Sequence, residues 1–319
     1  MKNILFFKLL VFCVISAIIL SSCGEDEIEV PRNDPEIAIA SFFSQDSIKV
    51  YVFKSVYILA GYNTTEGDIY IDSAVVKFGD GLFIDTLERK EEIYYISTLP
   101  TMHKRSYYIL KKFLQDNKEY SITVSSPGLK TAEATTTIPR KVEIIKTDTV
   151  PTIYTSMPYY FPNGIPYYIC KITFKDPAHI KNYYYFEIRG VDIQAYNEGF
   201  KGKGTPKGFH CHDPIVEENI EWSDANKILF SDELIDGKEY SLEILISKET
   251  FEYDHVFLYL HSVSKDFYLH IKSYSQYDKA KEDEFSEPVL IYSNIQNGIG
   301  IFAGCSTSVD SLMGIKNIE

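Results

Sequence analysis

Four consecutive residues with metal-ligating side chains, His210-Cys211-His212-Asp213, are the sharpest chemical feature of the sequence. Zinc and copper accept imidazole and thiolate donors. Adjacent residues rarely all turn toward one ion, and in a strand His210 and His212 share one face while Cys211 points away. A further ligand has to come from a distant residue such as His179 or Glu217. We keep His210, Cys211 and His212 as metal candidates, against the alternative of a solvent-facing loop whose thiol lies in the core or in a disulfide.

Aromatic side chains crowd the proline-rich stretch from Tyr154 to Tyr168. Prolines stiffen a loop, so exposed aromatic rings there lose little further entropy on binding, and tyrosine is enriched at interfaces. The candidate binding surface consists of Tyr159, Tyr160, Phe161 and Tyr167. In the alternative interpretation, Tyr167 already belongs to the next strand and the other rings cover a joint between domains.

Signatures of common enzymes are missing from the sequence. It contains no G-x-S-x-G, H-E-x-x-H or C-x-x-C motif, and the Gly- and Lys-rich stretch at 199–208 lacks the spacing of a phosphate loop. We therefore expect a non-enzymatic protein without a cofactor, whose small ligand, if it has one, is unknown.

The N-terminus predicts where the protein resides. Lys2 and Lys8 precede an apolar stretch that ends in Leu20-Ser21-Ser22-Cys23, which is typical of a signal cleaved before a lipid-modified cysteine. The alternative is an ordinary signal followed by a coincidental cysteine. We expect residues 1–22 to be a lipoprotein signal peptide, Cys23 to carry the lipid that holds the chain on a membrane, and residues 23–36 to be an acidic tether.

Charge and cysteine content narrow the choice of partners and compartment. The formal net charge is −13, and it falls to −15 once Lys2 and Lys8 leave with the signal, which argues against a nucleic-acid partner. Beyond Cys23, the thiols are Cys170, Cys211 and Cys305. Three thiols form at most one disulfide, and three buried free thiols is the alternative that we prefer.

The elements that must position these residues are mainly β-strands. The sequence has 25 Tyr and 20 Phe against four Met and one Trp, and residues such as Ile48, Val50 and Val52 alternate with Lys49, Tyr51 and Phe53 in a period of two. We predict two immunoglobulin- or fibronectin III-like β-sandwich domains, at 37–139 and 142–305, followed by a tail at 306–319.

An internal echo supports two similar domains. The segment from Leu114 to Ile122 recurs, 120 residues later, as Leu234 to Leu242, and each copy has an Asp-Asn or Asp-Gly turn before a tyrosine. This resembles the tyrosine corner of such sandwiches, in which the phenol bonds back to the backbone; a chance match is the alternative. In the second domain, Ser264 is expected to cap a short helix near 264–278. We expect this helix to plug one end of the core, with Phe267, Ile271, Tyr274 and Tyr277 on one face, or else to bind a partner.

The C-terminal run Phe285-Ser286-Glu287-Pro288-Val289, followed by Ser293-Asn294-Ile295 and Gly298-Ile299-Gly300-Ile301-Phe302, resembles a family of Bacteroidota lipoproteins of unknown function. The resemblance implies an outer-membrane lipoprotein, often encoded beside a TonB-dependent receptor, and supplies no catalytic residues. We therefore expect an outer-membrane-anchored accessory or ligand-capture module for such a receptor; the acidic run after Cys23 is compatible with exposure at the cell surface. The alternatives are an adhesion or glycan-binding lipoprotein and a metal-binding lipoprotein or hydrolase.

Overall fold

The computed structural model describes residues 34–55, 69–96, 99–154, 165–191, 205–211, 213, 222–224, 227–248, 250, 255–281 and 286–313. Pro35–Glu319 form one compact unit. The expected signal peptide and Cys23 lie outside the described residues. In the described part of the chain, no helix has the length and apolar character needed to span a membrane.

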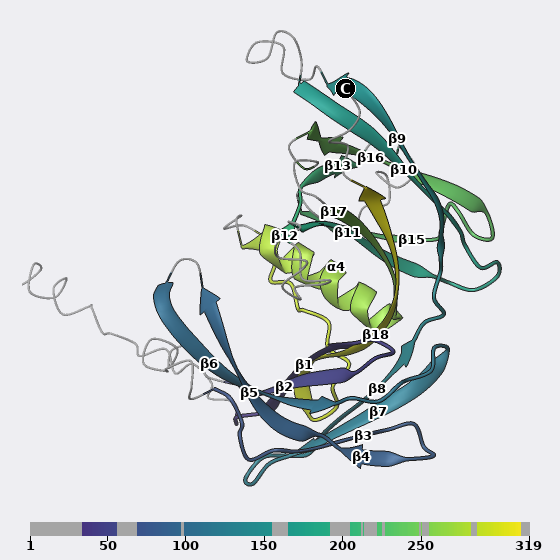
Figure 1. Ribbon diagram of the computed structural model, residues 1–319. Coiled ribbons are helices and arrows are strands. Elements are labelled where there is room, and N and C mark those ends of the chain that lie inside the picture. The colour runs from purple at the N-terminus through teal and green to yellow at the C-terminus, as the bar shows by residue number, and fades with distance from the viewer. Residues whose placement is uncertain are drawn as a thin grey trace, which may run out of the picture. The chain divides into compact units, whose positions relative to one another are not determined.

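The protein is mainly β, with its strands in three sheets (Figure 1). The ten-stranded sheet contains, in spatial order, β14 (Trp222–Asp224), β15 (Lys227–Ser231), β11 (Tyr183–Val191), β17 (His255–Val263), β18 (Gly298–Met313), β1 (Ile37–Phe43), β2 (Ile48–Lys54), β6 (Leu99–Leu110) and β5 (Glu88–Ile96), with β12 (Thr205–Pro206) beside β11. One four-stranded sheet contains β4 (Ile84–Thr86), β3 (Val75–Gly79), β7 (Lys118–Ser125) and β8 (Ala132–Ile138). The other contains β13 (Phe209–Cys211), β16 (Glu239–Ser247), β10 (Ile165–Lys175) and β9 (Ile144–Tyr154).

The first hydrophobic core lies between the ten-stranded sheet and the sheet formed by β4, β3, β7 and β8. Ile48, Val50 and Val52 of β2 are buried in it, as are Ile122 and Val124 of β7. The intervening residues of β2 are half-buried or exposed. The predicted period-two strands are therefore confirmed here, because one side of each pleated strand packs inward.

The second hydrophobic core lies between the ten-stranded sheet and the sheet formed by β13, β16, β10 and β9. Phe174 of β10 and Ile244 of β16 pack with Tyr184 and Phe186 of β11 and with Leu258 of β17. All five side chains are almost fully buried. Two sheets thus enclose each core, and the ten-stranded sheet takes part in both.

Strand β18 connects the two halves of the ten-stranded sheet. Its first residues pair in parallel with β1, and the residues from Cys305 to Met313 pair antiparallel with β17. Phe302 of β18 contributes to the first core, which otherwise comes mostly from residues before 139. Residues 306–313, expected to belong to a tail, extend this strand because they continue the pairing with β17. Independent folding of 37–139 and 142–305 stays a prediction.

The Gly-Ile-Gly-Ile-Phe run has a steric explanation. Gly300 has φ +110, and a Cβ atom there would lie 2.1 Å from the carbonyl oxygen of Ile39; at Gly298 the corresponding distance, to Ile37 O, is 2.4 Å. Glycine is therefore required for β18 to approach β1. Asn294 supports the same strand, since its side chain accepts from the N–H of Phe302 over 3.0 Å and donates to the Phe302 carbonyl over 2.8 Å.

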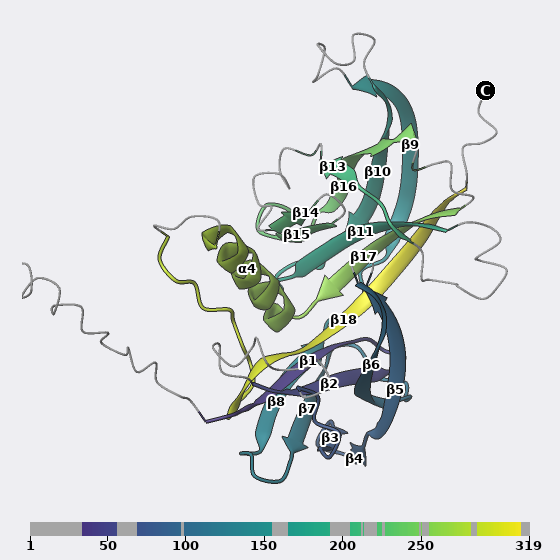
Figure 2. The same ribbon diagram turned by 90° about the vertical axis from the view of Figure 1, so that its left-hand side faces the viewer.

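The helix expected after Ser264 is present as α4 (Lys265–Ala280), and the Ser264 side chain accepts from the Phe267 N–H as predicted. The expected buried face was partly wrong, because Tyr274 and Tyr277 are exposed while Tyr268 is buried. The helix also does not close one end of a core. It lies on one side of β11, β17 and β18 (Figure 2), where its residues pack with Tyr183 and Tyr185 of β11.

The internal echo corresponds to two similar turns. Asn117 and Gly237 both have positive φ, 54° and 70°, and each precedes a strand that has the echoed Glu-Tyr pair within its first three residues. The hydroxyl of Tyr120 accepts from the backbone N–H of Gln115, so this phenol bonds back to the backbone as predicted. The second copy differs, because Tyr240 donates to the Asp213 carboxylate.

Candidate binding surface on the ten-stranded sheet

The first cluster of functional interest lies on the face of β2, β6 and β5 that points away from the first core. Because Val50 and Val52 of β2 turn inward, Lys49, Tyr51 and Phe53 lie on the opposite face. Cross-strand pairing places Glu92 of β5 opposite Arg105 of β6. We call Lys49, Tyr51, Glu92, Arg105 and Tyr107 the Glu92 cluster.

Three donors converge on the Glu92 carboxylate. Lys49 Nζ lies 2.5 Å from Oε2, and Oε1 accepts from the Tyr51 hydroxyl over 2.7 Å and from Arg105 Nε over 2.5 Å. Burial opposes ionisation, but the hydrogen bonds from Lys49, Tyr51 and Arg105 prevail and lower the pKa of Glu92 to about 2. Glu92 is therefore a fixed anion that holds two cations in place.

The same two cations lie against aromatic rings. Lys49 Nζ is 4.0 Å from the ring centroid of Tyr107, and Arg105 Cζ is 4.8 Å from that of Tyr51. Beside them, the rings of Phe53 and Tyr70 have centroids 4.9 Å apart. Rings held by cation–π contacts and by neighbouring rings lose little further freedom when a ligand binds, which is the property that the Tyr159 loop was expected to supply.

A second cluster lies on β11, β17 and β18, and we call Glu187, Arg189, Tyr259, His261 and Thr307 the Glu187 cluster. Glu187 is 5% exposed, and its Oε1 lies 2.9 Å from Arg189 Nη2 and 3.6 Å from His261 Nε2. His261 Nδ1 is 2.8 Å from the hydroxyl oxygen of Thr307. Burial opposes ionisation of Glu187, but His261 and Arg189 outweigh it and lower the pKa of this carboxyl.

A hydroxyl, an imidazole and a carboxylate in series are the parts that nucleophilic catalysis uses. In such a chain the carboxylate stabilises the imidazolium that forms during the reaction. Here Arg189 already neutralises Glu187 through both Nε and Nη2, each at 2.9 Å. We therefore interpret the Glu187 cluster as a polar connection between neighbouring strands.

Both clusters lie on one face of the ten-stranded sheet. Residues opposite each other on neighbouring strands share a face, and the register pairs Tyr51 with Ala40, Phe42 with Ala303, and Thr307 with His261. Helix α4 lies on this face between the clusters, since the Phe267 ring contacts those of Phe42 and Tyr185, with centroids 5.0 and 5.5 Å apart. We call this face of the sheet the outer face.

Three carboxylates gather elsewhere, at the turns that follow β10 and β15. Oxygens of Asp176, Asp232 and Asp236 lie within 4.8 Å of one another, close enough to share a cation. Each is already bonded to the protein: Asp176 accepts from Tyr184 and from the Gly237 N–H, and Asp232 pairs with Lys181 over 2.9 Å. Burial, with the neighbouring aspartates, raises the pKa of Asp176. These contacts indicate that the carboxylates hold the two turns together.

The structure describes two of the three residues that the sequence offered as metal ligands. His210 is exposed and Cys211 is half-buried against the second core, because they are neighbours on β13; His212 lies outside the described residues. Cys170, Cys211 and Cys305 are free thiols, so no disulfide joins them. Cys170 is fully buried, and Cys211 and Cys305 are intermediate in exposure; the Cys305 side chain packs against the cluster of Leu229, Val263 and Tyr268.

Only one member of the predicted aromatic surface can be placed. Tyr159, Tyr160 and Phe161 lie outside the described residues. Tyr167 is half-buried on β10, with its ring centroid 6.0 Å from that of His210. The alternative interpretation, in which Tyr167 belongs to a strand, is therefore correct for this residue.

Sequence reasoning missed the Glu92 cluster. The alternation of Lys49, Tyr51 and Phe53 with the core residues of β2 was visible, but such positions are usually only a solvent face. The signal that distinguishes them is the pairing of Glu92 with Arg105, which depends on the register of β5 against β6. That register is a tertiary property, and the sequence of either strand alone does not predict it.

Comparison with known proteins adds a family and no function. The family model described as a domain of unknown function, DUF4249, matches residues 25–311, which is nearly the whole sequence beyond the expected signal. Among curated proteins, none matches the chain.

Proposed function

The chain belongs to the DUF4249 family of unknown function. We propose that it is a lipoprotein anchored in the outer membrane. In this proposal it serves a TonB-dependent receptor as a non-enzymatic accessory or ligand-capture module. Leu20-Ser21-Ser22-Cys23 supports the anchor. An acyl anchor confines the protein to the membrane surface, which raises its effective concentration toward a partner in the same membrane.

The observation that carries a binding role is the Glu92 cluster on the outer face. Its rings and cations are fixed before any ligand arrives, and Lys49, Arg105 and Glu92 together carry one net positive charge on a chain whose net charge is −13. A local positive site on an acidic protein favours ligands or partner surfaces with negative or electron-rich groups. Tyrosine, arginine and lysine also provide the hydrogen-bond donors that orient such groups.

Co-purification tests the receptor part of this proposal. The full-length protein, extracted from native membranes in mild detergent, is expected to bring the receptor with it. Tyr51→Ala and Tyr107→Ala are expected to weaken that association, whereas Tyr277→Ala, which truncates an exposed ring on α4, serves as the matched control. Absence of the receptor from the parent preparation would count against the accessory role.

A glycan-binding or adhesion lipoprotein is the second candidate, favoured by the neighbouring rings of Tyr51, Phe53, Tyr70 and Tyr107. Flat rings beside fixed charged groups provide both apolar contact and orientation for a sugar. Binding of the intact protein to immobilised glycans, and its loss in Tyr51→Ala, would support this role. Replacement of Tyr159, Tyr160 and Phe161 by alanine tests the loop predicted from the sequence.

The finer fold class is part of the same proposal. We infer that the two halves are built on immunoglobulin-like sandwiches. The bond between Gln115 and Tyr120 supports this for the first half, and the positive φ of Gly237 supports a related turn in the second. A solved structure whose strand order matches that of such a sandwich in each half is the test.

A further inference from the structure

Three large apolar side chains are strongly exposed at one end of the first half. Leu82 is 88% exposed, Ile84 73% and Phe113 74%. Leu82 and Ile84 belong to the β3–β4 hairpin, and Phe113 to the connection between β6 and β7. We call these three residues the apolar tip. Single exposed apolar residues are ordinary, but a group on adjoining turns indicates a surface that something covers.

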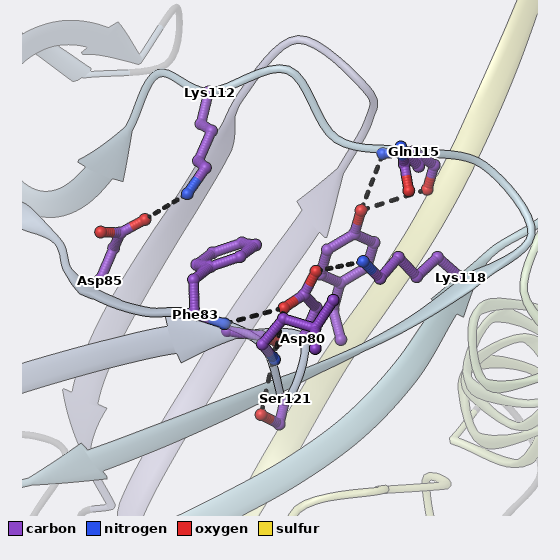
Figure 3. A network of polar contacts seen from close by, with 10 residues as sticks. Asp80, Phe83, Asp85, Lys112, Gln115, Lys118 and Ser121 are labelled. Carbon is purple, nitrogen blue, oxygen red and sulfur yellow. Dashed lines mark hydrogen bonds and ion pairs between the residues drawn. The ribbon is translucent and has the colours of Figure 1, made fainter.

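The two turns that carry the apolar tip are joined. Lys112, next to Phe113, reaches across to Asp85 over 2.8 Å, and its Nζ lies 3.3 Å from the ring centroid of Phe83 (Figure 3). The connection also bonds to the turn after β1, since the Leu114 N–H donates to the Gln45 carbonyl over 2.7 Å. The three turns therefore form one end of the molecule's first half.

The β3–β4 turn is held rigidly from within. Asp80 Oδ1 accepts from the N–H groups of Leu82 and Phe83 over 2.9 and 3.1 Å, and the other carboxylate oxygen pairs with Lys118 (Figure 3). The conformation that exposes Leu82 is thus fixed before any contact forms, so contact costs little conformational entropy. These bonds also pair Asp80 and Asp85 with lysines, which reduces their repulsion from an anionic surface.

We propose that the apolar tip inserts into the lipid surface to which Cys23 anchors the chain. Separate side chains projecting from turns suit a fluid interface, which closes around them. Lys111 is exposed two residues before Phe113, where a long cationic side chain reaches the headgroups while the apolar residues lie deeper. The inference rests on the lipid anchor of the proposed function.

The length of chain before β1 permits this contact. Residues 24 to 36 provide a span of at most about 43 Å. Strand β1 has seven residues and runs toward the turn that contacts the apolar tip, which places that turn about 23 Å from the start of the strand. The span therefore exceeds the distance that the anchored end must cover.

Quenching of tryptophan fluorescence tests the proposal on the full-length lipidated protein. Phe113→Trp adds a fluorophore at the apolar tip. Ile180→Trp adds one in a turn of the second half, at a residue that is 61% exposed. Each is compared with the parent, which contains Trp222, in vesicles of phosphatidylethanolamine and phosphatidylglycerol with brominated acyl chains. We expect the added emission of Phe113→Trp to shift to shorter wavelength and to be quenched by the brominated acyl chains. The added emission of Ile180→Trp is expected to persist.

Flotation of the vesicles distinguishes insertion of the apolar tip from attachment through the lipid anchor. If the parent floats and the Phe113→Trp emission is quenched no more than that of Ile180→Trp, tip insertion is overturned while the anchor stands. If the parent does not float, both are overturned. Leu82→Ser in the Phe113→Trp chain is expected to reduce quenching, and undiminished quenching would overturn the assignment of Leu82 to the inserted surface.

Discussion

The backbone N–H of Gln115 donates a hydrogen bond of 2.7 Å to the hydroxyl oxygen of Tyr120, five residues later in the chain. The Tyr120 ring is only 2% exposed and stacks on Phe78, with centroids 5.2 Å apart. One side chain thus joins the first core to the loop before β7. The bond satisfies a backbone donor that would otherwise have to find water or another partner.

Tyr120→Phe removes this bond and leaves the ring in place. We expect a loss of about 1 kcal/mol in the free energy of unfolding, because the Gln115 N–H loses its acceptor. Urea unfolding followed by circular dichroism measures it. Tyr277→Phe, at a ring 36% exposed on α4, is the control and is expected to change stability by less than about 0.5 kcal/mol. Equal effects of the two variants would contradict the role given to Tyr120.

Gly300→Ala tests whether the close approach of β18 to β1 holds the ten-stranded sheet together. The new Cβ would meet the Ile39 carbonyl oxygen at 2.1 Å in a backbone with φ +110. We expect a loss of more than about 3 kcal/mol, or failure to fold, since both the contact and the conformation are unfavourable.

Gly81→Ala provides the matched control for this glycine. Gly81 also has positive φ, +84, but a Cβ there would have nothing within 4 Å. Its expected cost is about 1 kcal/mol, from the backbone conformation alone. Thermal unfolding of both variants separates the steric term from the conformational one, and similar melting temperatures would show that β18 can move away from β1.

The strands themselves were readable from the sequence because one side of each is buried. Ile48, Val50 and Val52 alternate with half-exposed residues, and the burial of β2 follows that pattern. Ser264 likewise predicted the start of α4, since a serine before a helical segment can accept hydrogen bonds from the first free N–H groups. Such local signals are enough to place elements.

What the sequence did not reveal is how the elements combine. Parallel pairing of the first strand with the last, through Ile37 and Gly298, joins residues more than 250 positions apart and leaves no local mark. The convergence of Lys49 and Arg105 on Glu92 depends in the same way on three strands and their register. The helix face was misjudged because its packing partners, Tyr183 and Tyr185, come from a distant strand.

The free thiols are expected to differ in reactivity. Burial, with the charges of Asp310 and Asp148, raises the pKa of Cys170 to about 12, and burial raises that of Cys305 to about 11. Thiolates are the reactive species, so both should resist alkylation of the native protein at pH 8. Cys211 is half-buried and is expected to react first. Mass spectrometry of peptides after brief iodoacetamide treatment measures the order, and early labelling of Cys170 would contradict its burial.

Glu92→Gln is expected to make the free energy of unfolding less dependent on pH in the acid range. The folded-state pKa of Glu92, about 2, lies below its ordinary value of 4.5, so the folded protein binds this proton less tightly than the unfolded chain does. The carboxylate therefore stabilises the fold above about pH 4.5, and this contribution is lost as the pH falls toward 2. At pH 7 the variant should lose about 2 kcal/mol, because Lys49 and Arg105 lose their shared anion.

The pH profile distinguishes this charge effect from a change in packing. Unfolding free energies of parent and Glu92→Gln, measured in urea between pH 7 and pH 2, should converge as Glu92 becomes protonated in the parent. Glu119→Gln, at an exposed position of β7, is the control and should track the parent throughout. A constant difference between parent and Glu92→Gln across this range would mean that the three donors stabilise the strands without the carboxylate charge.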